Sequence, residues 1–172
     1  MADPGQRPLL FLDVDGPLIP FGGTQPYPTY GEDHSHPLLP RVDPDHGRRL
    51  GALPCDLVWA TTWMDEANEV VSPRLGLPPL AVVTWPEPSD LDERDGLHWK
   101  TRALVAWAAN RPFAWVDDEI TEADRAWVSA HHPGKALLHH VDARHGLTET
   151  DYVVLSEWLG TNHPVWAVAW PG

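Results

Sequence analysis

The stretch Leu9-Leu10-Phe11-Leu12-Asp13-Val14-Asp15-Gly16 carries the most information in this sequence. Its apolar run predicts a strand that is covered on both faces, as in a parallel sheet. Two carboxylates follow with one residue between them, and an extended backbone puts side chains at positions i and i+2 on the same side. Like charges that close need a cation or a shared proton. The stretch therefore predicts a buried strand that ends in a charged site, where Gly16 lets the chain turn away.

Apolar runs alternate with helical segments along the rest of the chain. Strands are expected at Pro8–Val14, Cys55–Ala60, Leu80–Thr84, Phe113–Val116 and Ala136–Val141. Helices are expected from Asp43-Pro44 to about Leu53, over Met64–Arg74, over Trp99–Asn110, from a cap at Thr121, and over Thr148–Leu159, with Gly160 just past the end. This alternation predicts right-handed crossovers and a three-layer, Rossmann-like α/β fold, with helices on both faces of a parallel sheet. We expect one domain over residues 1–172.

Two segments do not fit the alternation. Residues 17–44 contain seven prolines, which prevent a regular helix. Because Phe21, Tyr27 and Tyr30 give this segment something to pack, we interpret it as an ordered flap or small cap inserted after the first strand. The acidic segment from Trp85 to His98 is expected to be a solvated connection.

Composition narrows the class of protein. The chain has 172 residues, 42% of them hydrophobic and 22% charged, which is typical of a globular domain. A net charge of −13 makes it a poor generic binder of nucleic acid or of an anionic membrane, although a local basic groove stays open. A single cysteine, Cys55, rules out an intrachain disulfide and fits a reducing compartment, so a cytoplasmic protein is expected. No apolar run approaches the length of a membrane span, and no targeting segment is visible.

Polar residues follow several of the predicted strands. Thr61 and Thr62 come directly after an apolar run, Asp117-Asp118 after another, and Lys100 stands at the start of a helix. In an open parallel sheet, ligands bind beyond the carboxyl ends of the strands. Carboxylates, hydroxyls and one ammonium gathered at that edge would make a site for Mg²⁺ and a phosphoryl group.

In this order the motifs resemble the phosphatase branch of the haloacid dehalogenase (HAD) superfamily, over about residues 9 to 160. The resemblance implies that Asp13 is the nucleophile and Asp15 the general acid and base. It implies that Thr61, or its neighbour Thr62, holds a phosphoryl oxygen and that Lys100 neutralises charge. Thr61 is favoured because it comes directly after the apolar run.

The resemblance also implies a metal site and a sheet order. Asp117 and Asp118 would hold Mg²⁺ together with Asp13 and the backbone carbonyl of Asp15, and the strands would lie in the order 5-4-1-2-3. Receiver domains use similar groups, but in a different chain order. In a true dehalogenase, Asp15 would have no acid or base role.

The sequence therefore predicts Mg²⁺-dependent hydrolysis of a phosphomonoester through an aspartyl-phosphate. In this superfamily, members with little or no cap tend to act on bulky substrates, which admits the end of a nucleic acid or a phosphoprotein. A small metabolite under the flap, transfer to an acceptor other than water, and a catalytically silent binding module stay open. Trp63 is a candidate for the entrance to the site. The spacing of Trp99, Leu104 and Trp107 predicts the buried face of a helix, not a platform for a nucleobase.

Overall fold

The computed structural model describes residues 6–87 and 90–162, and a five-stranded parallel sheet lies at its centre. The strands lie in the order β3-β2-β1-β4-β5, which confirms the expected order. Their bounds are β1 (Leu9–Leu12), β2 (Asp56–Trp59), β3 (Ala81–Val82), β4 (Phe113–Asp117) and β5 (Ala136–His140). Each overlaps a predicted strand, and β3 is much shorter than expected.

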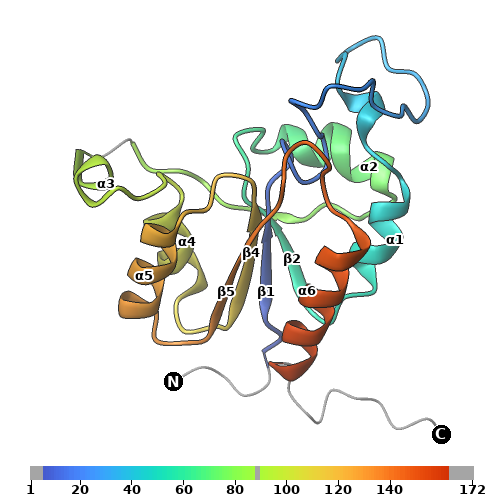
Figure 1. Ribbon diagram of the computed structural model, residues 1–172. Coiled ribbons are helices and arrows are strands. Elements are labelled where there is room, and N and C mark those ends of the chain that lie inside the picture. The colour runs from blue at the N-terminus through green and yellow to red at the C-terminus, as the bar shows by residue number, and fades with distance from the viewer. Residues whose placement is uncertain (1–5, 88–89, 163–172) are drawn as a thin grey trace, which may run out of the picture.

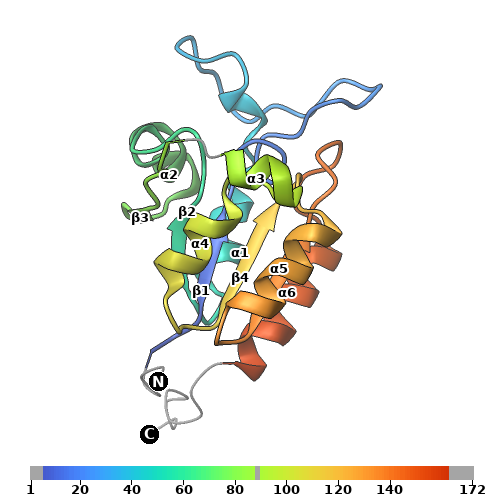
Figure 2. The same cartoon turned by 90° about the vertical axis from the view of Figure 1, so that its left-hand side faces the viewer.

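Helices cover both faces of the sheet, so the three-layer α/β fold is confirmed (Figures 1 and 2). One face carries α1 (Asp45–Gly51), α6 (Glu149–Thr161), and a π-helical turn, η2 (Ala67–Val71), that continues into α2 (Ser72–Leu75). The other face carries α4 (Thr101–Ala108) and α5 (Glu122–His131). Gly160 lies inside α6 and does not end it, because the helix runs on to Thr161. Among the described residues, no helix is both long enough and apolar enough to cross a membrane.

Strand β1 is the central element, and its side chains alternate between the two layers. Leu10 and Leu12 pack in the cluster formed with α1, α2 and α6, whereas Leu9 and Phe11 pack in the cluster formed with α4 and α5. All four are at most 1% exposed. Burial of one such side chain stabilises a fold by roughly 1.5–3 kcal/mol, so the apolar run holds β1 at the centre of the sheet.

The register of the sheet brings the polar strand ends to one level. Leu12 lies opposite Trp59 of β2 and Val116 of β4. Asp13 directly follows Leu12 at the end of β1, and Asp117 directly follows Val116 as the last residue of β4. Both carboxylates therefore emerge side by side at the carboxyl edge of the sheet.

Residues 17–44 lie beyond this edge and have little regular structure apart from one turn, η1 (Leu39–Arg41) (Figure 1). The segment is held to the domain by buried apolar side chains, Leu39 and Val42 among them. Polar contacts add to this: Arg41 donates to the carbonyl of Pro20 at 2.9 Å, and Arg74 pairs with Asp33 at 2.9 Å.

The acidic segment between β3 and α4 includes a short helix, α3 (Asp90–Asp95), which has no buried residue and so agrees with the expected solvated connection. Arg102 ties this helix down through a 2.7 Å hydrogen bond to Asp92. One expectation about α4 was wrong. The tryptophans near α4 are not a buried face: Leu104 is 1% exposed, but Trp99 is 38% and Trp107 39% exposed. The reason is that α4 begins only at Thr101, so Trp99 precedes the helix and does not follow its period.

Candidate active site

Three carboxylates gather at the carboxyl edge of the sheet. Asp13, Asp117 and Asp118 each place one oxygen within 4.8 Å of the others. Asp13 follows β1, and the other two stand at the end of β4. Gly16 makes room for this cluster: its φ is +95°, and a Cβ there would lie 2.7 Å from Cγ of Asp118. A glycine is therefore required on both conformational and steric grounds.

Lys100 balances part of this negative charge. Its Nζ lies 2.8 Å from Oδ2 of Asp117 and 3.2 Å from Oδ2 of Asp13, and the side chain is 3% exposed. Further hydrogen bonds orient the carboxylates: Val14 N donates to Asp13 Oδ1 at 2.8 Å, and Glu119 N donates to Asp117 Oδ1 at 3.0 Å. Because both ion pairs are almost dry, the buried ammonium of Lys100 needs at least one of these carboxylates to balance its charge.

A buried carboxylate on α5 fixes the backbone on either side of Lys100. Asp124 Oδ1 accepts hydrogen bonds from His98 N at 2.8 Å and from Thr101 Oγ1 at 2.7 Å. Its other oxygen accepts from Thr121 N at 2.9 Å, which completes the capping box of α5. The predicted cap at Thr121 is thus confirmed, and the same box anchors the residues that flank the lysine.

Burial and neighbouring charges shift the pKa values of Asp13, Asp118 and Lys100. Burial raises the pKa of Asp13 to about 7; Asp117 adds to the rise and Lys100 opposes it. Burial, with Asp117 beside it, raises the pKa of Asp118 to about 6. Burial alone would lower the pKa of Lys100, but the two aspartates that it contacts outweigh that effect and raise it. Because burial opposes the ionisation of Asp13 and Asp118, these two carboxyl groups gain from a bound divalent cation, which favours the charged form.

The side chain of Asp15 lines the same pocket but is not a member of the three-carboxylate cluster. Its Oδ2 accepts a 3.0 Å hydrogen bond from Nε1 of Trp63, which is the candidate entrance residue. The ring of His36, from the 17–44 segment, packs against that indole at 4.8 Å. The hydrogen bond to Trp63 therefore gives the Asp15 side chain a defined orientation, outside the group of three carboxylates that could hold a metal ion.

The two threonines after β2 occupy different positions. Thr61 is fully buried, and its Oγ1 accepts from Trp63 N at 3.2 Å. Its carbonyl accepts from Nε1 of Trp85 at 3.0 Å. Thr62 is exposed and lines the pocket above the carboxylates, whereas Thr61 does not.

The pocket itself is small, about 140 Å³. Its walls include Asp13, Asp15, Lys100 and Asp118, and five further residues complete them: Phe21, Thr62, His98, Trp99 and Glu119. Of these five, only Thr62 was among the predicted site residues. The nearest signal in the sequence is position, because His98-Trp99 directly precede Lys100 and Glu119 directly follows Asp118.

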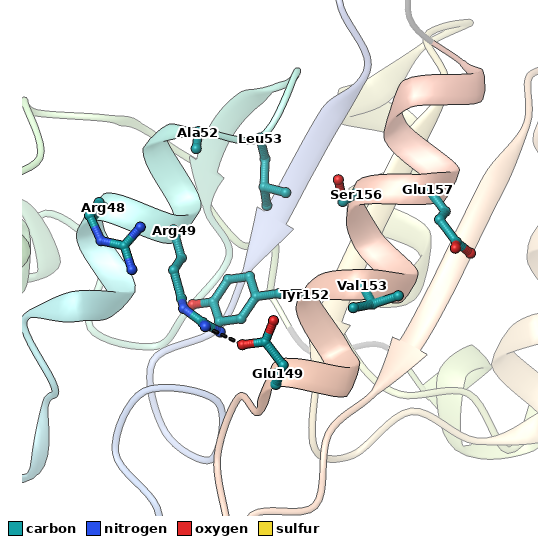
Figure 3. Close-up of a pocket in the computed structure, with 9 residues that line it drawn as sticks. All are labelled: Arg48, Arg49, Ala52, Leu53, Glu149, Tyr152, Val153, Ser156 and Glu157. Atoms are coloured by element: carbon teal, nitrogen blue, oxygen red, sulfur yellow. Dashed lines mark hydrogen bonds and ion pairs between the residues drawn. The ribbon is translucent and has the colours of Figure 1, made fainter.

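A wider hollow, about 400 Å³, lies between α1 and α6 (Figure 3). There the guanidinium of Arg49 pairs with Glu149 and lies over the ring of Tyr152 at 4.9 Å. Arg48, also in the lining of this hollow, pairs with Asp45. Within residues 6–87 and 90–162, the Asp13 cluster is the one place where three ligating side chains converge. We therefore place the candidate active site at the sheet edge.

The residues of that cluster fit a divalent cation. All three donors are carboxylate oxygens, the ligands that Mg²⁺ and Ca²⁺ prefer, and Mg²⁺ takes few protein ligands because it keeps several waters. Asp13, Asp117 and Asp118 would hold the ion. The side chain of Asp15 is not part of the cluster, so any contribution from this residue would come from its backbone.

A parallel sheet of this order, with a buried aspartate after its central strand, a paired lysine and an acidic pair after the neighbouring strand, defines a HAD-type hydrolase. Comparison with family models agrees. Residues 9–152 match the family described as the HAD domain in Swiss Army Knife RNA repair proteins, and the chain belongs to this family. No curated protein and no solved structure matches the chain.

Proposed function

We propose that the protein is a Mg²⁺-dependent phosphomonoester hydrolase that acts through an aspartyl-phosphate on Asp13, with the terminal phosphate of an RNA strand as its substrate. The observation that carries the proposal is the cluster of Asp13, Lys100, Asp117 and Asp118, of which all but the buried Asp117 line a pocket of about 140 Å³. A nucleophile, a fixed ammonium and hard oxygen donors are the groups that phosphoryl transfer needs.

In the first step, a carboxylate oxygen of Asp13 attacks phosphorus, and the bond from phosphorus to the leaving oxygen breaks. Lys100 stabilises the charge on the transferring group from its place beside Asp13. Asp15 gives a proton to the leaving oxygen, so the product departs as an alcohol. A hydroxyl after β2, that of Thr62 at the pocket wall or that of Thr61, holds a phosphoryl oxygen.

In the second step, water attacks the aspartyl-phosphate. Asp15, now ionised, accepts the proton from that water, and the bond between phosphorus and the Asp13 oxygen breaks to release inorganic phosphate. Trp63 keeps the Asp15 side chain in place through its indole hydrogen bond during both transfers. When bound by Asp13, Asp117 and Asp118, Mg²⁺ supplies further neutralisation of phosphoryl charge.

Two observations support an RNA end as the substrate. The family to which the chain belongs is described as a domain of RNA repair proteins. The pocket of about 140 Å³ is well below the roughly 300 Å³ at which small-molecule sites begin, so it accepts a phosphoryl group while most of the substrate stays outside. Cleavage of a terminal monoester needs no more room than this.

Phosphate release from RNA oligonucleotides that carry a terminal phosphate tests the proposal. The wild type should release phosphate only with Mg²⁺, and Asp13→Asn should lose the activity. An acid-quenched reaction with labelled phosphate should leave label on the wild-type protein and none on Asp13→Asn. Asp15→Asn should still be labelled by an aryl phosphate, whose leaving group needs no acid, but should turn over slowly because no base activates water.

The matched control is Glu157→Gln, which removes an exposed carboxylate from α6, away from the sheet edge, and should match the wild type. Activity that survives both Asp13→Asn and chelation would contradict the mechanism. Release of phosphate from peptides or sugars but not from RNA would contradict the substrate. Binding of phosphorylated ligands without any turnover would indicate a silent module.

A further inference from the structure

We infer that the rim of the pocket is a binding site for the nucleobase next to the scissile phosphate, formed by the aromatic rings of Trp99 and Phe21. This inference rests on the proposed function and adds to it which part of the substrate is recognised. It also reverses the expectation, drawn from helical spacing, that Trp99 belongs to a buried helix face.

Size places the base at the rim. Asp13 and Lys100 are the buried residues in the lining of this 140 Å³ pocket, and a phosphoryl group with its cation takes up most of such a space. The nucleoside that carries the phosphate must therefore lie where the pocket opens. The exposed large apolar side chains of its wall are Trp99, 38% exposed, and Phe21, 44% exposed.

Trp99 is held in a fixed position although it is exposed. The ring of Trp85 meets it edge-on at 4.9 Å, and the ring of His98 packs beside it at 5.3 Å. The ammonium of Lys100 lies 5.5 Å from its centre, which ties the ring to the catalytic end of the pocket. His98 is itself fixed, because its Nδ1 accepts from Lys100 N and its Nε2 lies 2.8 Å from Glu119. A ring that is already ordered loses little entropy when a base stacks on it.

Phe21 approaches the pocket from another part of the fold. It belongs to the 17–44 segment, whose buried residues Leu39 and Val42 join the cluster on the α1, α2 and α6 face. Its backbone N–H donates to the carbonyl of Ala143 at 2.8 Å, so the position of the residue is fixed while its ring stays exposed. Trp85, which packs against Trp99, belongs to the cluster on the opposite face. The rim therefore offers rings from both layers.

Charge favours this mode of recognition over backbone binding. The chain carries a net charge of −13, and a protein that grips RNA through its phosphates needs several lysines or arginines along the strand. Stacking needs no positive charge, and every base has a π-face. The terminal nucleoside should therefore supply most of the affinity, with little gain from a longer chain.

The test compares adenosine monophosphates with ribose phosphate, which lacks the base. The wild type should prefer the nucleotides in kcat/KM, and Trp99→Leu or Phe21→Leu should each lower that preference about tenfold, the range of one base–aromatic stack. Trp99→Phe should keep most of the preference. Trp107→Leu is the matched control: Trp107 is 39% exposed on α4 but does not line the pocket, so the preference should not change.

Calorimetry with the chelator-treated wild type measures the same preference as binding, without turnover. No turnover of any phosphate, together with nucleotide binding that depends on Trp99 and Phe21, would refute the proposed function and leave the base site standing. Turnover with an equal preference in the wild type, Trp99→Leu and Phe21→Leu would refute the base site alone. Affinity that rises steeply with RNA length and falls steeply with salt would also refute it, because that is backbone recognition.

Discussion

Replacement of Asp13 by asparagine should stabilise the protein when no metal is present, although it abolishes activity. Burial raises the pKa of this carboxyl group from 3.8 to about 7, so the folded state opposes its ionisation. At 1.36 kcal/mol per pKa unit, ionised Asp13 costs the folded state about 4 kcal/mol above pH 7. Asparagine has nearly the same shape and no charge, and Lys100 keeps its shorter contact with Asp117, 2.8 Å.

The direction of the pKa shift determines how the stability difference between Asp13→Asn and the wild type changes with pH. Between pH 3.8 and about 7 the folded protein binds more protons at this position than the unfolded chain does. The contribution of Asp13 to stability is therefore present at low pH and is lost as the pH rises through 7. The advantage of Asp13→Asn over the wild type should be near zero at pH 4, grow with pH, and level off above pH 7.

Urea unfolding in EDTA at several pH values measures the difference in unfolding free energy between Asp13→Asn and the wild type. Saturating Mg²⁺ should reduce this difference. An ion present at 100 times its Kd stabilises the wild type by about 2.7 kcal/mol, whereas the variant lacks one of the carboxylates that would bind it. Asp117→Asn is the control: Asp117 is fully buried and accepts from Lys100 and Trp115, so its replacement should destabilise the fold. An Asp13→Asn protein no more stable than the wild type at pH 8 in EDTA would refute the reasoning.

Three further predictions follow from single contacts. Gly16→Ala forces a Cβ within 2.7 Å of Asp118 Cγ, so Mg²⁺ affinity, measured by calorimetry, should fall roughly tenfold to a hundredfold; unchanged affinity would mean that Asp118 is not a ligand. Trp63→Phe removes the hydrogen bond to Asp15 and should lower kcat about tenfold with little change in unfolding, whereas an equal loss in stability would indicate packing alone. Burial lowers the pKa of His46 from 6.5, so the unfolded chain takes up that proton more readily than the folded protein, and stability should fall as the pH drops below 6.5. His46→Gln should make that fall shallower in urea titrations at pH 7 and pH 5.

The sheet could be predicted because its signals are local. A short uninterrupted apolar run such as Leu9–Leu12 favours a strand buried on both faces, and the order of the motifs, read with the HAD resemblance, predicted the strand order. The proximity of Asp13 and Asp117 could also be predicted, because the carboxyl ends of parallel strands lie at one edge of the sheet. Boundaries were less accurate: β3 keeps two residues because it is an edge strand that pairs only with β2.

The rim of the site could not be predicted, because its residues follow no period. Trp99 was assigned to a helix that begins two residues later, and Phe21 lies in a segment without regular structure. What positions them is tertiary: a contact with Trp85 in one case and a hydrogen bond to the carbonyl of Ala143 in the other. Neither partner is close in sequence, so composition alone could not show that these rings flank the carboxylates.

The net charge of the chain and the proposed RNA substrate are compatible when recognition is confined to an end. A protein of net charge −13 gains little from the phosphates along a strand. A pocket of about 140 Å³ admits a terminal monoester, but an internal phosphodiester would have to bring two chains into the same space. Under the proposed function, size would exclude the body of the RNA from the pocket, the negative charge of the chain would weaken binding along the strand, and the two rings at the rim would supply the remaining contact. The same features that make the chain a poor general RNA binder would make it selective for ends.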